Sequence, residues 1–379
     1  MLSESRPLRV FAYCGALVAV LFGLLLSGAL ARLGLFRAIG TRVPRFLGLT
    51  PAFSIHPWSC THEQISAYNL TGQRALITGA NSGLGLETAI VLARLGASVA
   101  LACRAEAKCR AAADDVRKTA APGAAVSTWT LDTSSLASVR AFAADFLASN
   151  DAPLDMFFQN AGIASAGVWA AGSPTLPLSV DGIEAVFAAN HIGHALLYEL
   201  LQPRLRAARV ARVVLTSSAS HFDTYSYGVA TDLDTLNSPP ERSLAALLNP
   251  YGQSKLAQVL WAQEATRRLA LDNVTNVYVN SLHPGMVDTG IWFANPIISD
   301  RLKTTVVAWL QRNMMWSRRD GALTMLWLGI ATDALIAGDV RGLYYHPQCV
   351  RVEPFVLARN ETLQKAVWLF TEELTRERA

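Results

Sequence analysis

Charged residues are scarce in this 379-residue chain: Asp, Glu, Lys and Arg make up 16% of it, while hydrophobic residues make up 51%. Disordered, collagen-like and coiled-coil proteins have other compositions, so these classes are excluded and a large buried core is expected. The net charge is only +4, from 33 basic and 29 acidic residues. This charge is too small and too dispersed to indicate nucleic-acid binding, and we expect no nucleic-acid partner.

Cysteine is also sparse, and no two cysteines form a Cys-x-x-Cys pair. An odd set of five indicates neither a disulfide framework nor a zinc site, and it favours a reducing compartment. We therefore predict a function that uses no metal. The five cysteines are Cys14, Cys60, Cys103, Cys109 and Cys349.

The longest uncharged run lies near the N-terminus, from Val10 to Ala31, and contains 22 residues. A helix of this length spans the roughly 30 Å hydrocarbon core of a bilayer. We therefore predict a single membrane pass, residues 10–31, within an anchor of residues 1–32. A cleaved secretory signal is the alternative, because Arg6 and Arg9 precede the run and Ala-Leu-Ala at 29–31 resembles a cleavage site.

Basic residues are more numerous after this run than before it, so the positive-inside rule places the rest of the chain in the cytosol, at the endoplasmic reticulum membrane. No acidic residue occurs between Glu4 and Glu63. Such an arginine-bearing, acid-free stretch also resembles an organellar transit segment, which stays open as an alternative. Residues 33–69 are predicted to be a connector, because three prolines discourage one long helix there.

From about residue 70, short β-branched or aliphatic runs alternate with longer alanine- and leucine-rich stretches of helical type. This order predicts an α/β fold over residues 70–379: a Rossmann-type, doubly wound parallel sheet of about seven strands with helices on both faces. The predicted strands are Arg74–Thr78, Ser98–Cys103, Val126–Leu131, Leu154–Phe158, Arg212–Thr216, Val277–Leu282 and Gly342–Tyr345.

A glycine-rich turn follows the first predicted strand, where residues 78–85 read TGANSGLG and lead into a predicted helix. Glycines at a strand-to-helix turn let a pyrophosphate approach the helix N-terminus closely. The turn therefore predicts a dinucleotide site, and a purely structural turn is the alternative. Its candidate cofactor-binding residues are Gly79, Asn81, Ser82, Gly83, Leu84 and Gly85.

The second predicted strand is followed by Arg104, at a position where dinucleotide-binding folds commonly have an acidic residue for the ribose 2′-hydroxyl. A guanidinium suits a 2′-phosphate, so we predict NADP(H), with NAD(H) as the alternative. Asp132 follows the third strand. It is a candidate for binding the adenine amino group, and capping of the next helix is its alternative role.

Tyr251 and Lys255 lie four residues apart in a segment of helical type, and therefore on one helix face. A neighbouring ammonium favours the phenolate and lowers the pKa of a tyrosine, which suits it to general acid and base catalysis. Asn160-Ala161-Gly162 follows the fourth predicted strand and Ser217-Ser218 follows the fifth. The carboxyl ends of parallel strands are where such sheets bind ligands, so we expect these motifs to form one site.

Together with the Pro284-Gly285 turn, these motifs resemble the short-chain dehydrogenase/reductase family over about residues 70–375. The stretches NHIGH at 190–194, SSASH at 217–221 and SLHPGMV at 281–287 are similar to the branch that holds retinol dehydrogenases and the WW-domain oxidoreductase. No WW module is recognised in this chain.

The resemblance implies hydride transfer between nicotinamide and a substrate carbon, with Tyr251 as acid and base. It implies that Lys255 binds the nicotinamide ribose and lowers the Tyr251 pKa, and that Ser218 hydrogen-bonds the reacting oxygen, with Ser217 as the alternative. It further implies that Asn190 holds a water in a proton relay to Lys255, and that the enzyme is a homodimer. The cofactor site it implies also includes Asn160, Ala161, Gly162, Tyr251, Lys255, Pro284, Gly285 and Thr289.

The segment after the Pro284-Gly285 turn usually covers the substrate in this family, and here it is strongly apolar. We therefore expect a lipophilic substrate drawn from the membrane: a retinoid, a sterol or a long-chain aldehyde or ketone. An ordinary core-closing helix, a non-catalytic membrane-tethered scaffold and a plastid reductase of the protochlorophyllide type stay open as alternatives. The apolar positions are Trp292, Phe293, Ile297, Ile298, Val306, Val307, Trp309 and Leu310.

Overall fold

The computed structural model describes residues 59–165, 175–241, 249–290 and 315–376, together with the single positions 304 and 308. The predicted membrane pass and the apolar positions between Trp292 and Leu310 lie outside these residues. Within the described ranges, no helix has the length and apolar character needed to cross a bilayer.

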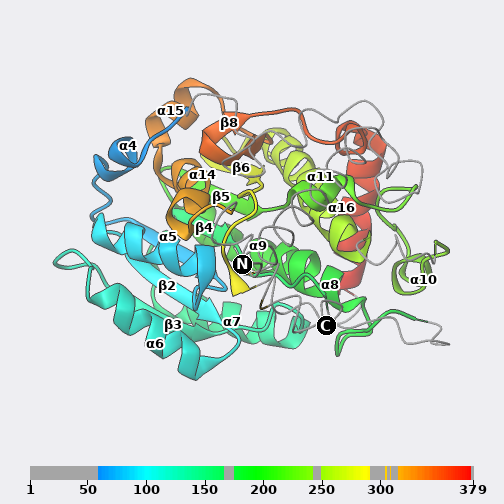
Figure 1. The fold of residues 1–379 in the computed structure, drawn as a ribbon, viewed down its shortest axis with the longest axis horizontal. Helices are drawn as coiled ribbons and strands as arrows, with labels where there is room; N and C mark the ends of the chain where they lie inside the picture. Colours follow the sequence, from blue (N-terminus) through cyan, green and yellow to red (C-terminus); the bar gives the residue numbers. More distant parts are fainter. Residues whose placement is uncertain are drawn as a thin grey trace, which may run out of the picture.

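An eight-stranded sheet forms the centre of the fold, in the order β3-β2-β1-β4-β5-β6-β7-β8 (Figure 1). Neighbouring strands are parallel except β7 and β8, which are antiparallel. The strand order reverses between β1 and β4, and sheets of this kind bind ligands in the crevice at such a reversal. The strands are β1 (Arg74–Thr78), β2 (Ser98–Cys103), β3 (Val126–Thr130), β4 (Met156–Gln159), β5 (Ala211–Thr216), β6 (Val277–Leu282), β7 (Tyr344–His346) and β8 (Val350–Arg351).

Helices cover both faces of this sheet (Figure 1). On one face α5 packs with α6 and α14; on the other, α7 packs with α9, and α11 packs with α16. The longer helices are α5 (Gly83–Arg94), α6 (Glu106–Arg117), α7 (Leu136–Ser149), α9 (Gly193–Arg206), α11 (Asn249–Leu271), α14 (Arg318–Ile330) and α16 (Glu361–Arg376). The shorter ones are α4 (His62–Ser66), α8 (Ala185–Phe187), η2 (Ala188–Ile192), η3 (Ala219–Phe222), α10 (Leu233–Asn237), α15 (Thr332–Ala337), η7 (Pro347–Cys349) and η8 (Val356–Arg359).

The central strands are mostly apolar because both of their faces are buried, and successive side chains point to opposite faces. In β1, Leu76 belongs to the core on the side of α7, α9 and α11. Its neighbours Ala75 and Ile77 belong to the core on the side of α5, α6 and α14. The uninterrupted apolar runs of the sequence are therefore strands of a doubly covered sheet.

The predicted α/β fold with a largely parallel sheet is confirmed, and β1, β2 and β6 have the predicted bounds. The prediction of about seven strands missed β8, because two residues after a turn carry no alternating pattern. The other predicted strands are shifted or changed in length by one or two residues at an end: β3 stops at Thr130, β4 is Met156–Gln159, β5 begins at Ala211 and β7 is Tyr344–His346.

The packed fold begins before the predicted boundary at residue 70. Cys60 and Ile65 are buried in the same core as α5 and α14. The short helix α4 starts with a capping box, in which the Thr61 hydroxyl accepts from the N–H of Gln64 and the Gln64 side chain accepts from the N–H of Thr61. The last part of the predicted connector therefore belongs to the domain.

Two disulfides correct the expectation that the cysteines are unpaired. Cys60 is joined to Cys349, 289 residues later, and Cys103 is joined to Cys109. The Cα atoms lie 5.7 Å apart in the first pair and 5.8 Å apart in the second, within the range that a disulfide spans. Spacing along the chain did not indicate the first pair, because the fold brings these two cysteines together from opposite ends of the domain.

We expect loss of the Cys60–Cys349 disulfide to destabilise the protein more than loss of Cys103–Cys109. A cross-link stabilises mainly by restricting the unfolded chain, and the restriction grows with the length of the closed loop. Cys349→Ala should lower the free energy of unfolding by about 2–5 kcal/mol, and Cys109→Ala by less. Urea unfolding without reductant measures both. Equal losses, or no change after Cys349→Ala, would contradict this reading.

Candidate active site

The glycine-rich turn lies where β1 passes into α5. Gly79 and Gly83 have φ angles of +66° and +58°, in the left-handed region that favours glycine. The residue that precedes the helix, Ser82, makes no side-chain hydrogen bond to it. The first N–H groups of α5 therefore lack a side-chain cap, and such an N-terminus suits a bound phosphate.

Thr78 holds the loop after β4 beside this turn. Its Oγ1 accepts hydrogen bonds from the N–H groups of Asn160 (2.9 Å) and Ala161 (3.0 Å). The Asn160 side-chain amide donates in return to the Thr78 carbonyl oxygen (2.9 Å). A Cβ on the next residue, Gly162, would lie 3.5 Å from Lys255 Nζ. The predicted residues 160–162 thus lie between the glycine turn and Lys255.

The side chains of Ser218 and Tyr251 are hydrogen-bonded to each other, at the end of β5 and in the first turn of α11. Ser217 makes a different contact, because its hydroxyl donates to the backbone carbonyl oxygen of Lys255 (2.8 Å). Ser218 Oγ also accepts from the N–H of Ser220 (3.1 Å), which fixes its orientation. Of the two serines, the structure therefore places Ser218 at the Tyr251 phenol.

Lys255 is 4% exposed, and its ammonium donates to the Thr216 carbonyl oxygen (2.7 Å) and to Gln258 Oε1 (3.1 Å). Burial lowers the pKa of Lys255 to about 7, because desolvation penalises the charged form. The nitrogen lies 5.6 Å from the centre of the Tyr251 ring. Lys255 is therefore close to Tyr251, and near neutral pH it is only partly charged.

The predicted lowering of the Tyr251 pKa by Lys255 is not what the structure shows. Burial raises the pKa of Tyr251 above its ordinary value, and the hydrogen bond with Ser218 opposes that rise. The prediction considered the Lys255 ammonium beside the phenol and did not include burial. Both groups are in fact desolvated, so each is shifted towards its neutral form.

Asn190 lies fully buried in η2, and protein groups occupy its polar atoms. Its side chain accepts from the N–H of Ile163 (2.8 Å) and donates to the Ile163 carbonyl (3.0 Å) and the Ser254 hydroxyl (2.9 Å). Its backbone carbonyl accepts from His194 Nδ1 (3.0 Å) and Gln258 Nε2 (2.8 Å). A carbonyl oxygen has two lone pairs, so both acceptor positions of this backbone carbonyl are used within the protein. The role of Asn190 in holding a relay water stays a prediction.

The turn after β6 lies against the glycine turn. A Cβ on Gly83 would be 3.3 Å from Thr289 Cγ2, so these two predicted cofactor residues are in contact range. Gly285 has a φ of +83°, and its N–H donates to His283 Nδ1 (3.0 Å). This hydrogen bond shapes the predicted Pro284-Gly285 turn.

Arg104 and Asp132 lie at the carboxyl ends of β2 and β3. The Arg104 side chain is exposed and has no ion pair or hydrogen bond with any residue in the described ranges. Asp132 Oδ1 accepts from both the N–H (2.9 Å) and the hydroxyl (2.6 Å) of Ser134. The cap of α7 is Ser135, so the alternative role of Asp132 as a helix cap is wrong, and Asp132 instead holds the turn before that helix.

Three residues of the site were absent from the predicted set: Thr78, His194 and Gln258. Thr78 begins the glycine motif, and its role depends on the loop after β4. Helical spacing was the available signal for the other two, because His194 is four residues after Asn190 and Gln258 is three after Lys255.

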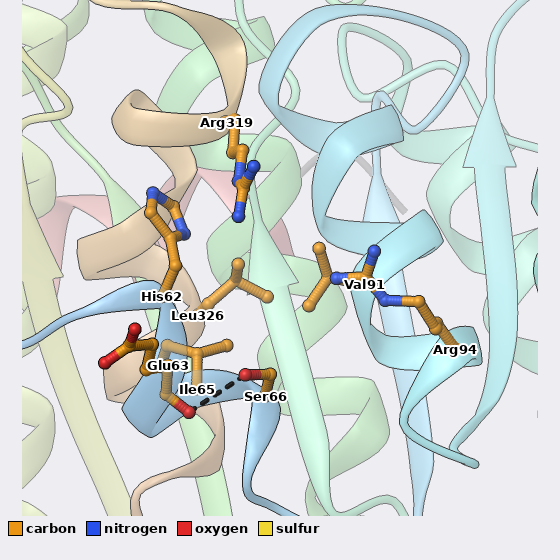
Figure 2. A pocket seen from close by; sticks show the side chains of 8 residues that line it. All are labelled: His62, Glu63, Ile65, Ser66, Val91, Arg94, Arg319 and Leu326. Carbon is orange, nitrogen blue, oxygen red and sulfur yellow. Dashed lines mark hydrogen bonds between the residues drawn. The ribbon is translucent and has the colours of Figure 1, made fainter.

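A cavity of about 110 Å³ lies between α4, α5 and α14 (Figure 2). His62, Arg94 and Arg319 are among the side chains around it. Val91 and Arg94, near the C-terminal end of α5, line the cavity, whereas Gly83 begins this helix, so about 12 Å of helix separates the cavity from the glycine turn. None of its lining residues is a predicted site residue, and it is not the candidate active site.

Comparisons with known proteins agree with this geometry. A family model described as short chain dehydrogenase matches residues 73–230. The WW domain-containing oxidoreductase of Gallus gallus is 36% identical over 84% of this chain and 72% of its own length. Retinol dehydrogenase 13 of Homo sapiens is 32% identical over 80% of this chain and 84% of its own length.

Among solved structures, an uncharacterised protein from Mycobacterium paratuberculosis superposes with a TM-score of 0.59 at 29% identity, covering 82% of this chain and 95% of that one. The family match, the relatives and the glycine turn beside Ser218, Tyr251 and Lys255 all lead to one assignment. The chain belongs to the short-chain dehydrogenase/reductase family and is an NAD(P)-dependent oxidoreductase.

Proposed function

We propose that this oxidoreductase interconverts a carbonyl and an alcohol on a lipophilic substrate, with NADP(H) as its preferred cofactor. The observation that carries the proposal is the hydrogen-bonded pair of Ser218 and Tyr251 beside Lys255. This group lies at the carboxyl ends of the central strands, next to a turn whose backbone suits a phosphate.

The residues around the strand ends fit a dinucleotide. Gly79 and Gly83 have left-handed φ angles in a turn that leads to a helix N-terminus without a side-chain cap, and such a turn suits a pyrophosphate. The Lys255 ammonium is placed to bind ribose hydroxyls, and the exposed Arg104 guanidinium is suited to a 2′-phosphate. When bound, the nicotinamide group supplies or accepts the hydride.

Tyr251 provides the proton in the reducing direction. Because burial raises its pKa, the phenol is protonated at neutral pH and can donate to a carbonyl oxygen that gains negative charge. The Ser218 hydroxyl, already bonded to this phenol, is placed to donate to the same oxygen. The nearby Lys255 favours the phenolate that remains, to the extent that the lysine is charged.

Two features support a lipophilic substrate. The segment after the Pro284-Gly285 turn is rich in Trp, Phe, Ile and Val, and one relative is named retinol dehydrogenase 13. The predicted membrane pass at residues 10–31 would hold the enzyme at the bilayer, where retinoids, sterols and long-chain carbonyl compounds dissolve.

Tyr251→Phe should reduce kcat for carbonyl reduction by about 10²- to 10⁴-fold, because the proton donor is removed. Ser218→Ala should reduce kcat by about 10²-fold. Ser217→Ala is the matched control, since its hydroxyl faces the backbone of α11, and we expect a much smaller effect. NADPH consumption measures all three variants, with circular dichroism as the test of folding. Equal losses in the two serine variants would show that the assignment of Ser218 is wrong.

Arg104→Ala should weaken NADPH binding and leave NADH binding nearly unchanged. A charge-assisted hydrogen bond to phosphate is worth about 1.5–3 kcal/mol, so the dissociation constant for NADPH should rise about 10- to 100-fold. Calorimetric titration with each cofactor measures this. A wild-type preference for NADH would overturn the role of Arg104.

The ratio kcat/KM should rise with the length of an unbranched aldehyde. Each methylene group buried in an apolar site contributes about 0.8 kcal/mol, which is about fourfold per carbon until the site is filled. A series of aldehydes assayed with NADPH measures the trend. A flat series would contradict the lipophilic site, and inactivity towards every aldehyde and ketone despite tight NADPH binding would favour the non-catalytic scaffold.

A further inference from the structure

Gln258 lies in the middle of α11, one helical turn after Lys255, and is 1% exposed. Both ends of its side-chain amide are used. Oε1 accepts from Lys255 Nζ (3.1 Å), and Nε2 donates to the Asn190 carbonyl oxygen (2.8 Å). The amide therefore links the Lys255 ammonium directly to the Asn190 carbonyl of η2.

The Asn190 carbonyl is also held from its other side. His194 Nδ1 lies 3.0 Å from it and must carry the hydrogen, because a carbonyl only accepts. Burial lowers the pKa of His194 to about 4, so the ring is neutral and its Nε2 accepts from the Thr78 hydroxyl (2.9 Å). A chain of hydrogen bonds thus runs from the end of β1 through His194, Asn190 and Gln258 to Lys255.

We propose that Gln258 is a positioning residue that holds the Lys255 ammonium at the active site by linking it to the Asn190 carbonyl. An amide does not titrate near neutral pH, so Gln258 fixes the ammonium in place without exchanging a proton with it. The catalytic consequence rests on the proposed function, whereas the effect of Gln258 on Lys255 itself does not.

The charge balance at Lys255 is simple in the described part of the chain. Tyr251 on the same helix and His194 on α9 are the titratable groups that interact with it. Its hydrogen-bond partners are neutral: the Thr216 carbonyl and the Gln258 amide. A change at position 258 therefore acts on a cation with no carboxylate partner, and its effect on Lys255 should be directly readable.

The test compares Gln258→Leu and Gln258→Glu with Gln253→Leu. Gln253 is a buried glutamine on the same helix. Its Oε1 accepts from the N–H of Ala230 and not from Lys255. Gln253→Leu therefore removes a buried amide of α11 without removing a contact of Lys255, and it reports the cost of a purely structural loss.

The first readout is the ionisation of Lys255 in the full chain. The sequence has five lysines, so ¹³C-labelled lysine gives five Cε signals to follow by NMR, and Lys255→Arg assigns the one of interest. Gln258→Leu should lower the titration midpoint, because the ammonium loses an acceptor. Gln258→Glu should raise it by about one pH unit or more, because a carboxylate favours the charged form. Gln253→Leu should leave it unchanged.

The second readout is steady-state kinetics with NADPH and an active aldehyde. Gln258→Leu should lower kcat about 10- to 100-fold, with a change in thermal stability no larger than that of Gln253→Leu. The proposal would be overturned if the pH-titration midpoint of Lys255 were the same in wild type, Gln258→Leu and Gln258→Glu. Equal losses of kcat in Gln258→Leu and Gln253→Leu would overturn it as well. Inactive wild-type protein would overturn the proposed function alone, since the NMR titration would still decide the role of Gln258.

Discussion

The Lys255 ammonium is buried at the junction of β5 and α11, and within the described residues its hydrogen bonds go to neutral oxygens. Removing a cation from water without an opposite charge is costly, and the group responds by a fall in pKa to about 7. The oxygens that offset part of this cost come from the end of β5 and from Gln258. The contacts that stabilise the Lys255 ammonium therefore depend on the relative positions of the sheet, α11 and η2.

The need to stabilise this buried ammonium explains why polar residues lie deep inside an otherwise apolar domain. Asn190, His194 and Gln258 are each almost fully buried, yet their polar atoms are paired with one another and with neighbouring backbone. A buried network is favourable only when its members are satisfied, because an unpaired group costs more than a pair contributes. This network also carries the link from β1, through Thr78 and His194, to the active-site helix.

Sequence reasoning was most successful where burial imposes a repeating pattern. β1, β2 and β6 are mostly apolar strands buried on both faces, and their bounds agree with prediction. The motifs at the strand ends also converge, because parallel strands bring their carboxyl ends to one edge of the sheet. The choice of Ser218 over Ser217 needed the structure, since adjacent residues differ only in the direction of their side chains.

Other features depend on contacts between residues far apart in the sequence and on the burial of side chains, and a local sequence pattern indicates neither. Gln258 has the helical spacing to meet Lys255, but its second partner, the Asn190 carbonyl, comes from a different element. The pKa of Tyr251 is raised by burial, and a Tyr-x-x-x-Lys motif does not indicate how deeply the tyrosine is buried. β8 and α4 are too short to show a period, and the pairing of Cys60 with Cys349 joins residues 289 positions apart.

The Cys60–Cys349 disulfide has a mechanical consequence. Cys60 lies just before α4, and Cys349 lies in the turn between β7 and β8 at the edge of the sheet. Tension applied to the chain at Cys60 would be transmitted by the covalent bond to that edge. Because α4 and β1 follow Cys60 in the chain, the pull would bypass them, and the strand ends that form the active site would be shielded from the load.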